Sequence, residues 1–151
     1  MSQNTAKKAL EAAETLCAER GERLTPVRRR VLELVLSAEK PVKAYDLLEL
    51  LKPGEGSAKP PTVYRALDFL MGMGLVHKVE ALNAFVGCTH SHDGQGAELF
   101  ICNACGSVEE RHTSAHAHGA DEGPSSCCPD GFIIERSVVE HFGRCRACAT
   151  A

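Results

Sequence analysis

Two pairs of cysteines in the second half of the chain have the spacing of metal-binding knuckles. They are Cys102-Asn-Ala-Cys105 and Cys145-Arg-Ala-Cys148. Four thiolates from two such pairs suit a closed, tetrahedral structural zinc site. The 39 residues between the pairs exceed the gap of a zinc ribbon, so we expect a small subdomain to fold between them. The alternative is two unrelated pairs, redox-active or simply buried. A short domain has a small apolar core and needs a crosslink for stability, which favours one zinc ion shared by the two pairs.

A second group of possible metal ligands combines imidazole, thiolate and carboxylate groups. Its members are, in chain order, His77, Cys88, His90, His92, Glu109 and Glu110. Ligands drawn from both halves of the chain would make a site whose occupancy sets the angle between two domains. A lone histidine is more often an ordinary surface residue, but the CTHSH run at 88–92 favours metal binding.

The segment between the knuckles gives weaker signals. His112 and His116 have the i, i+4 spacing of ligands on a helix, and His118 is close by. The run HTSAHAHGADEGPSSCCPDG is rich in Gly, Pro and Ser, however, and predicts a solvated loop. The vicinal Cys127 and Cys128 are compatible with a redox pair or with accessory ligands, and nothing in the sequence decides between them.

The composition of the 151-residue chain predicts a cytoplasmic protein with two domains. Eight cysteines without an export signal favour metal binding over disulfides, and no apolar run reaches the 18 residues of a membrane span. Residues 1–80 carry 13 basic and 11 acidic side chains, whereas residues 81–151 carry 4 and 9 with most of the His and Cys. We therefore predict one domain at 1–82 and a second, ligand-rich domain at 83–151.

The first half shows the periodicity of four helices followed by two short strands. Apolar stripes begin near Leu10, Val27, Ala44 and Val63, and the first of them includes Cys17, which we expect to be buried. Thr25-Pro26 is a start signal for the second helix. In the fourth, Pro60 precedes a proline, so we expect Pro61 to be the first helical residue. The runs LVHKVE and NAFVGC then predict a hairpin, so the pattern is that of a winged helix-turn-helix.

The fourth predicted helix has one basic residue on its outer face. Val63, Ala66, Leu67 and Leu70 cluster on one side at about 100° per residue, and Arg65 falls nearly opposite them. Thr62 and Tyr64 lie on the flanks of Arg65. Helix-turn-helix proteins place such residues in the major groove, where Arg makes a bidentate contact with guanine. The alternative is a solvated arginine on an ordinary amphipathic helix.

Several runs of this sequence resemble one protein family. They are RLTPVRRRVL, AYDLLELL, AKPPTVYRALDFL and GLVHKVEALNAFVGC, followed by the CNAC and CRAC knuckles. Over residues 10–148 the chain resembles the zinc uptake regulator branch of the ferric uptake regulator superfamily. The KPPTVYRALDFL run and the HKVE-to-GC spacing are the specific part of this likeness, whereas CxxC pairs occur widely.

The resemblance implies a fold and a function. The fold is α+β, with an N-terminal winged helix-turn-helix DNA-binding domain followed by a small α/β dimerisation domain that holds structural zinc. The function is that of a homodimeric, zinc-responsive repressor of zinc uptake genes, which binds palindromic double-stranded operator DNA. About two zinc ions per protomer are implied, one structural and one regulatory. Neither a membrane nor a small organic substrate is expected as a partner.

The resemblance also assigns roles to individual residues. The DNA-contacting residues that it implies are Tyr45 and Arg65, and the helix pattern adds Thr62 and Tyr64 on the flanks of Arg65. The structural zinc ligands are Cys102, Cys105, Cys145 and Cys148. The regulatory zinc ligands are His77, Cys88, His92 and Glu110, with His90 as the alternative to His92.

The sequence departs from the family pattern at two positions. Family members often carry a histidine seven residues before the first knuckle, but Gln95 stands there, so His92 is the nearest candidate. Ser137 replaces the histidine that iron-type members carry before the last strand, which favours the zinc branch over iron or peroxide sensing. The thiolate of Cys88 also suits zinc better than a manganese site with hard ligands.

A zinc enzyme with an open coordination position is the alternative class of protein. The deaminase pattern H-x-E…P-C-x-x-C is missing, because Ile101 precedes Cys102 and no H-x-E occurs upstream. The HExxH motif is missing too. We therefore expect no enzymatic activity, and the second hypothesis within the superfamily is a regulator that responds to another metal or to peroxide.

Overall fold

The computed structural model describes residues 3–51, 59–88, 97–112, 133 and 138–150. The chain divides into two compact units, Met1–Thr89 and His90–Ala151. The sequence placed the boundary after residue 82, seven residues earlier. The difference arises because the strand at Ala84–Gly87 pairs with the strand at Val76–Val79 and therefore belongs to the first unit.

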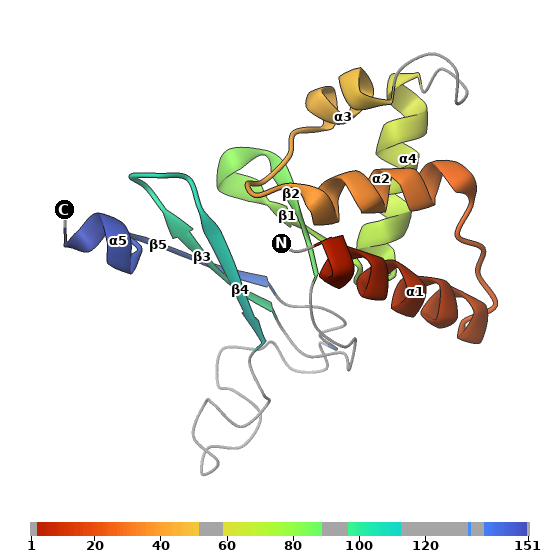
Figure 1. Cartoon of the computed structure of the whole chain (residues 1–151), viewed down its shortest axis with the longest axis horizontal. Coiled ribbons are helices and arrows are strands. Elements are labelled where there is room, and N and C mark those ends of the chain that lie inside the picture. Colours follow the sequence, from red (N-terminus) through yellow and green to blue (C-terminus); the bar gives the residue numbers. More distant parts are fainter. Residues whose placement is uncertain (1–2, 52–58, 89–96, 113–132, 134–137, 151) are drawn as a thin grey trace, which may run out of the picture. The chain divides into compact units, whose positions relative to one another are not determined.

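The first unit consists of four helices and a hairpin, as the sequence predicted (Figure 1). Its elements are α1 (Gln3–Glu19), α2 (Pro26–Ser37), α3 (Ala44–Leu50), α4 (Pro60–Gly72), β1 (Val76–Val79), the 3-10 turn η1 (Glu80–Leu82) and β2 (Ala84–Gly87). Helices α2, α3 and α4 contact one another, and β1 and β2 pack against α4 and α2. This arrangement is a winged helix-turn-helix, in which α4 follows α3 and the hairpin is the wing.

Helix starts in this unit follow from capping and from proline chemistry. Thr25 caps α2, since its side chain accepts a hydrogen bond of 3.4 Å from the backbone N–H of Arg28, and Pro26 is the first helical residue as predicted. Helix α4 begins at Pro60, so the prediction that it begins at Pro61 was wrong by one residue. Both prolines fit because N–H groups in the first turn have no partner within the helix. The extended conformation falls instead on Lys59, with ψ of 153°.

The core of the first unit lies between its helices and the base of the wing. The largest side chains buried completely there are Val31, Leu32, Leu36, Leu47, Val63, Leu67, Leu70 and Val76. Cys17 is buried in the same core, which confirms that it is an apolar residue of α1, and burial raises the pKa of its thiol. Because the four apolar positions of α4 all face this core, its opposite side is exposed.

The wing is held to the helices by its backbone. Strands β1 and β2 pair antiparallel with His77 opposite Val86, and the turn between them uses Asn83 in the left-handed conformation. Val42 and Phe85 exchange two hydrogen bonds of 2.9 and 2.8 Å, which tie the segment before α3 to β2. Strand β2 therefore has neighbours on both edges.

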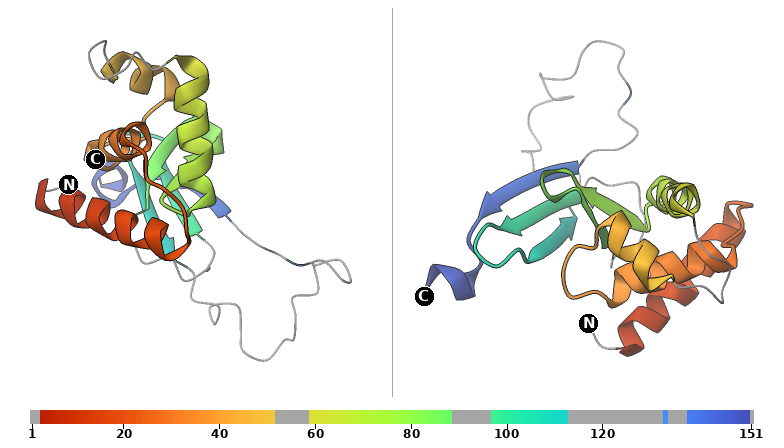
Figure 2. Two further views of the ribbon diagram at one scale, coloured as in Figure 1. Left: turned by 90° about the vertical axis from the view of Figure 1, so that its right-hand side faces the viewer. Right: turned by 90° about the horizontal axis from the view of Figure 1, so that it is seen from above.

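The second unit contains a three-stranded sheet of order β4-β3-β5 (Figure 2). Its elements are β3 (Ala97–Cys102), β4 (Val108–His112), β5 (Val138–Gly143) and the short helix α5 (Arg146–Ala149). Strands β3 and β4 form an antiparallel hairpin, whereas β5 pairs with β3 in parallel. His116, His118, Cys127 and Cys128 lie outside the described residues. None of the helices described in either unit is long and apolar enough to cross a bilayer.

Gly87, at the end of β2, tests how closely the wing packs on α2. A Cβ atom built on Gly87 would lie 2.5 Å from Cδ2 of the buried Leu36, so we expect Gly87→Ala to lower the free energy of unfolding by about 1–3 kcal/mol. Gly72→Ala is the matched control, because a Cβ there meets nothing within 4 Å and alanine favours a helix. Urea unfolding followed by circular dichroism measures both variants. Equal stability of the two would contradict the close approach.

Candidate functional site

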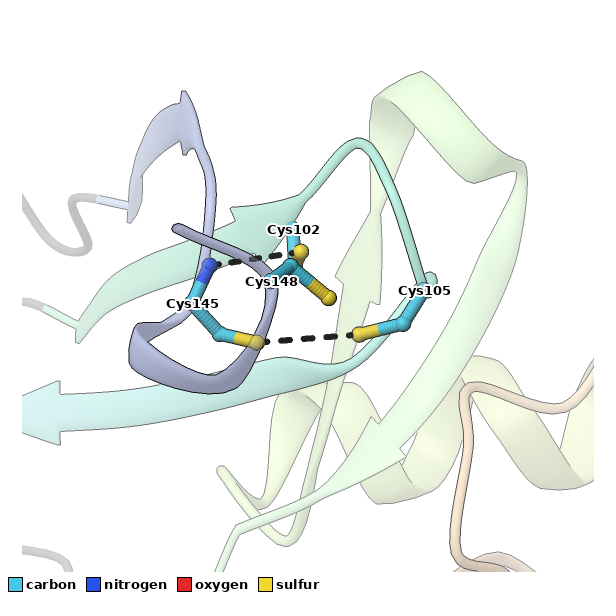
Figure 3. Close-up of side chains that lie close together, drawn as sticks. All are labelled: Cys102, Cys105, Cys145 and Cys148. Carbon is cyan, nitrogen blue, oxygen red and sulfur yellow. Dashed lines mark hydrogen bonds between the residues drawn. The ribbon is translucent and has the colours of Figure 1, made fainter. Parts of the chain in front are cut away.

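The four knuckle cysteines come together at one end of the sheet in the second unit (Figure 3). The sulfur atoms of Cys102, Cys105, Cys145 and Cys148 all lie within 4.8 Å of one another. Those of Cys105 and Cys145 are 3.9 Å apart. The predicted grouping of the two CxxC pairs is therefore present in the structure, and two unrelated pairs are excluded.

The sheet explains how two distant pairs meet. Cys102 is the last residue of β3, and the parallel register sets it opposite Gly143, the last residue of β5. The Asn103 N–H donates to the Gly143 carbonyl at 2.9 Å, which continues this pairing into the first knuckle. Cys145 is the N-cap of α5, whose first turn returns Cys148 toward the same point.

The turn of the first knuckle depends on two residues that the sequence analysis did not single out. Gly106 has a φ of +73°, where a residue with a Cβ would be strained. Its N–H donates to the Cys102 carbonyl at 2.9 Å, and the Cys102 N–H donates to the Ser107 carbonyl at 2.9 Å. The glycine directly after CNAC was the available signal, because a CxxC hairpin needs a residue that tolerates this conformation. Ser107 had no such signal.

The surroundings of three of the four thiols shift their pKa values in opposite directions. The Cys145 N–H donates to Sγ of Cys102 at 3.3 Å, and such backbone donors lower the pKa of Cys102 to about 6. The Ser107 hydroxyl, 3.1 Å from Sγ of Cys105, lowers the pKa of that thiol. The neighbouring sulfurs, Cys145 first, raise the pKa of Cys148 to about 12. Four thiolates this close repel one another, and a divalent metal that prefers sulfur removes that repulsion.

A second pair of ligands lies in the wing of the first unit. His77 is on β1 opposite Val86, and Cys88 is two residues beyond Val86, so both side chains leave the same face of the hairpin. Their ligand atoms lie within 4.8 Å of each other, and the two residues are 6 % and 7 % exposed. The Cys88 N–H donates to the Leu75 carbonyl at 2.9 Å, which holds the backbone in place. One imidazole beside one thiolate is a donor set typical of zinc.

The structure describes only one of the other predicted regulatory ligands, Glu110. Glu110 is half-buried on β4, where it is opposite Leu99. His90 and His92 lie outside the described residues, so the choice between them stays a prediction. His112 is the last residue of β4, and His116, its partner at i, i+4, lies outside the described residues.

The residues predicted to contact DNA are all on the surface of the helix-turn-helix. Thr62, Tyr64 and Arg65 are exposed in the first half of α4, on the side away from the core. Tyr45, in the first turn of α3, has 70 % of its surface exposed. The Lys43 N–H donates to the Asp46 carboxylate at 3.4 Å, which helps to fix the start of that helix. Two exposed tyrosines and an exposed arginine on neighbouring helices are an available recognition surface.

A winged helix-turn-helix joined to a small sheet that carries a four-cysteine centre defines a class of metal-binding regulators with a DNA-binding fold. The model of the ferric uptake regulator family matches residues 19–121, which is more than half of the chain. The chain therefore belongs to the ferric uptake regulator family.

Some individual members of the family are similar to this chain over nearly its whole length. The chain is 43 % identical to the zinc uptake regulation protein of Escherichia coli strain K12 over 151 residues, which covers 98 % of this chain and 85 % of that protein. A solved structure of a zinc uptake regulator complexed with zinc and DNA is 39 % identical, with a TM-score of 0.79 and coverage of 99 % and 97 % of the two chains. The structure of holo XcZur is 40 % identical, with a TM-score of 0.76 and coverage of 94 % and 97 %.

The four-cysteine centre predicts the effect of losing one ligand. We expect Cys102→Ser to lose one zinc ion per protomer, and with it the fold or solubility of the second unit, because three thiolates no longer close the tetrahedral site. Cys17→Ser is the matched control, since Cys17 is buried in the helical core of the first unit. Elemental analysis and size-exclusion chromatography measure the result. A Cys102→Ser protein with unchanged zinc content would show that the four thiols do not form the structural site.

Proposed function

We propose that this protein is a zinc-responsive transcriptional repressor that binds palindromic operator DNA as a zinc-loaded dimer and represses zinc uptake genes. The observation that carries the proposal is the placement of two zinc-type ligands, His77 and Cys88, in the wing directly after the exposed helix α4. The near full-length similarity to zinc uptake regulators, one of them solved with zinc and DNA, supports the same function. The site of action is the cytoplasm, where the DNA is.

The proposal assigns two zinc ions to each protomer, with different roles. Cys102, Cys105, Cys145 and Cys148 hold the structural ion, since four thiolates leave no open position. His77 and Cys88 bind the regulatory ion, and the remaining ligands are Glu110 and His92, with His90 as the alternative to His92. When bound, the regulatory ion supplies a double positive charge that joins ligands from the two halves of the sequence.

The mechanism we propose is a shift in population. When these ligands are not joined, the helix-turn-helix units of a dimer sample many orientations. When His77 and Cys88 share a metal with Glu110, the competent orientation is favoured, and a tenfold gain in operator affinity requires only about 1.4 kcal/mol of differential binding. The dimer then presents two α4 helices about one helical turn of DNA apart, ~34 Å, to match a palindrome.

The donor set supports zinc over the other metals to which this family responds. A hard-ligand manganese site favours carboxylate and water oxygen, whereas Cys88 offers a thiolate, which is a soft ligand. Peroxide and iron sites are richer in histidine and carboxylate, and Ser137 stands where the iron-type pattern has a histidine. Membership of a family of regulators also supports the view that the metal controls the binding of DNA and takes no part in an enzymatic reaction.

Substitution of Arg65 tests whether this side chain contacts a base of the operator. If its guanidinium makes a bidentate contact with guanine, Arg65→Ala should cost ~1–3 kcal/mol of operator binding and relax the sequence preference at one position of each half-site. Folding and zinc content should not change, because the side chain is exposed. Arg65→Lys keeps the charge but not the planar fork, so it should restore affinity for DNA of any sequence but not the preference. Binding titrations with duplexes that vary at single positions measure this, and an unchanged preference in Arg65→Ala would remove Arg65 from the interface.

His77 and Cys88 test the metal switch. Cys88→Ser and His77→Ala should each leave a folded dimer that keeps the zinc of the four-cysteine centre. Neither variant should bind the operator at zinc concentrations that saturate the wild type, because the competent orientation is no longer favoured. Zinc content, oligomeric state and operator binding across buffered zinc provide the measurement. Zinc-dependent operator binding by Cys88→Ser, at wild-type strength, would show that the switch lies elsewhere.

A further inference from the structure

Three consecutive arginines near the start of α2 have unequal partners. Nε of Arg29 lies 2.7 Å from a carboxylate oxygen of Glu14, and a guanidinium nitrogen of Arg30 lies 2.7 Å from Glu33. Within the part of the chain that the structure describes, Arg28 has no carboxylate partner. It is also in the first turn of α2, which contains no acidic residue and where the helix dipole disfavours a cation. Within the described residues, the charge of Arg28 thus has no carboxylate beside it.

The guanidinium of Arg28 is nevertheless held in one place. One of its terminal nitrogens donates to the Arg23 carbonyl at 2.8 Å. Its central carbon lies 3.6 Å from the centroid of the Phe69 ring of α4, a cation–π contact between the two helices. A guanidinium has five N–H donors in a fixed plane, so this arrangement leaves donors for a further acceptor. A half-buried, pre-oriented side chain loses little entropy when it binds.

The position of Phe69 places Arg28 beside the exposed face of α4. Thr62, Arg65 and Phe69 have i, i+3, i+7 spacing, so they follow one another along a single stripe of that helix. Phe69 is one turn beyond Arg65, and the Arg28 guanidinium stacks on its ring. The positive charge of Arg28 therefore extends the stripe that begins with the predicted base-contacting residues.

We propose that Arg28 binds a phosphate of the DNA backbone at the edge of the groove that α4 enters. A phosphate would set a negative charge against a fixed guanidinium near the positive end of a helix, where the described residues offer no carboxylate. The contact carries no sequence information, but it helps to set the register of Arg65, because Arg28 is held on Phe69, one turn beyond Arg65 on the same helix. The inference rests on the proposed function, since it adds a residue from α2 to the same DNA interface.

The salt dependence of DNA binding tests this proposal. The probe is duplex DNA selected from a random-sequence pool by the zinc-loaded wild-type protein, with unselected duplex beside it. A lost phosphate contact makes the slope of log K against log salt shallower by about 0.9, or about 2 for a dimer, between about 50 and 200 mM salt. We expect Arg28→Gln to show this change on both duplexes and to keep the base preference of the wild type.

Three further variants separate a phosphate contact from a structural role. Arg29→Gln removes the same charge from a residue paired with Glu14, so its slope should equal that of the wild type. Arg28→Lys keeps a point charge and should restore the slope. Phe69→Leu removes the stacking ring but no charge, so affinity should fall while the slope stays the same. Thermal unfolding of each variant shows whether it is folded.

The outcomes distinguish this inference from the function on which it rests. If the wild type binds selected DNA in a zinc-dependent manner and Arg28→Gln leaves the slope unchanged, only the role of Arg28 is overturned. The role of Arg28 is also overturned if Arg28→Gln and Phe69→Leu lower the DNA affinity equally at every salt concentration. Arg28 would then act only by packing against Phe69 of α4. If the zinc-loaded wild type binds no duplex, both the function and the inference are wrong.

Discussion

The meeting of four cysteine sulfurs is the constraint on which the second unit depends. Cys102 and Cys145 are 43 residues apart in the chain, and the Cys145 N–H donates to the sulfur of Cys102. Among the described residues of this unit, only Ala97, Leu99, Ile101 and Cys102 are buried, which is a small apolar core. A crosslink through metal supplies stability that such a core cannot. The parallel pairing of β3 and β5 and the closure of the knuckles therefore support each other.

The first unit has the opposite character, because helices and wing share a continuous apolar core. The two possible metal ligands of this unit, His77 and Cys88, are consequently attached to a well-packed hairpin. The Leu75 N–H donates to the Leu70 carbonyl near the end of α4, and the Leu75 carbonyl accepts from the Cys88 N–H, both at 2.9 Å. Two backbone hydrogen bonds thus connect the helix that carries Arg65 to the residue that carries a thiolate. A displacement of the Cys88 backbone is therefore transmitted to α4 through these two hydrogen bonds.

Much of this architecture could be predicted from the sequence, and the failures have physical reasons. The helices and the Thr25 cap follow from periodicity and local chemistry, and the cysteine pairs follow from their spacing. The start of α4 was misjudged because two adjacent prolines offer two nearly equal first residues. The parallel partner of β3 could not be predicted, since pairing across a long insertion leaves no periodic signal. The stacking of Arg28 on Phe69 was missed for a related reason, because it depends on how two helices pack.

The parallel pairing of β3 with β5 also determines the order in which a growing chain can fold. The core of the first unit is made by residues that emerge early from the ribosome, since it lies between Ala6 and Phe85. The four-sulfur centre cannot close until Cys148 has been synthesised, because β5 and α5 supply half of the ligands. A nascent chain therefore has a folded helix-turn-helix well before it has a completed metal centre. During that interval the first knuckle offers only two of the four thiols that the complete centre brings together.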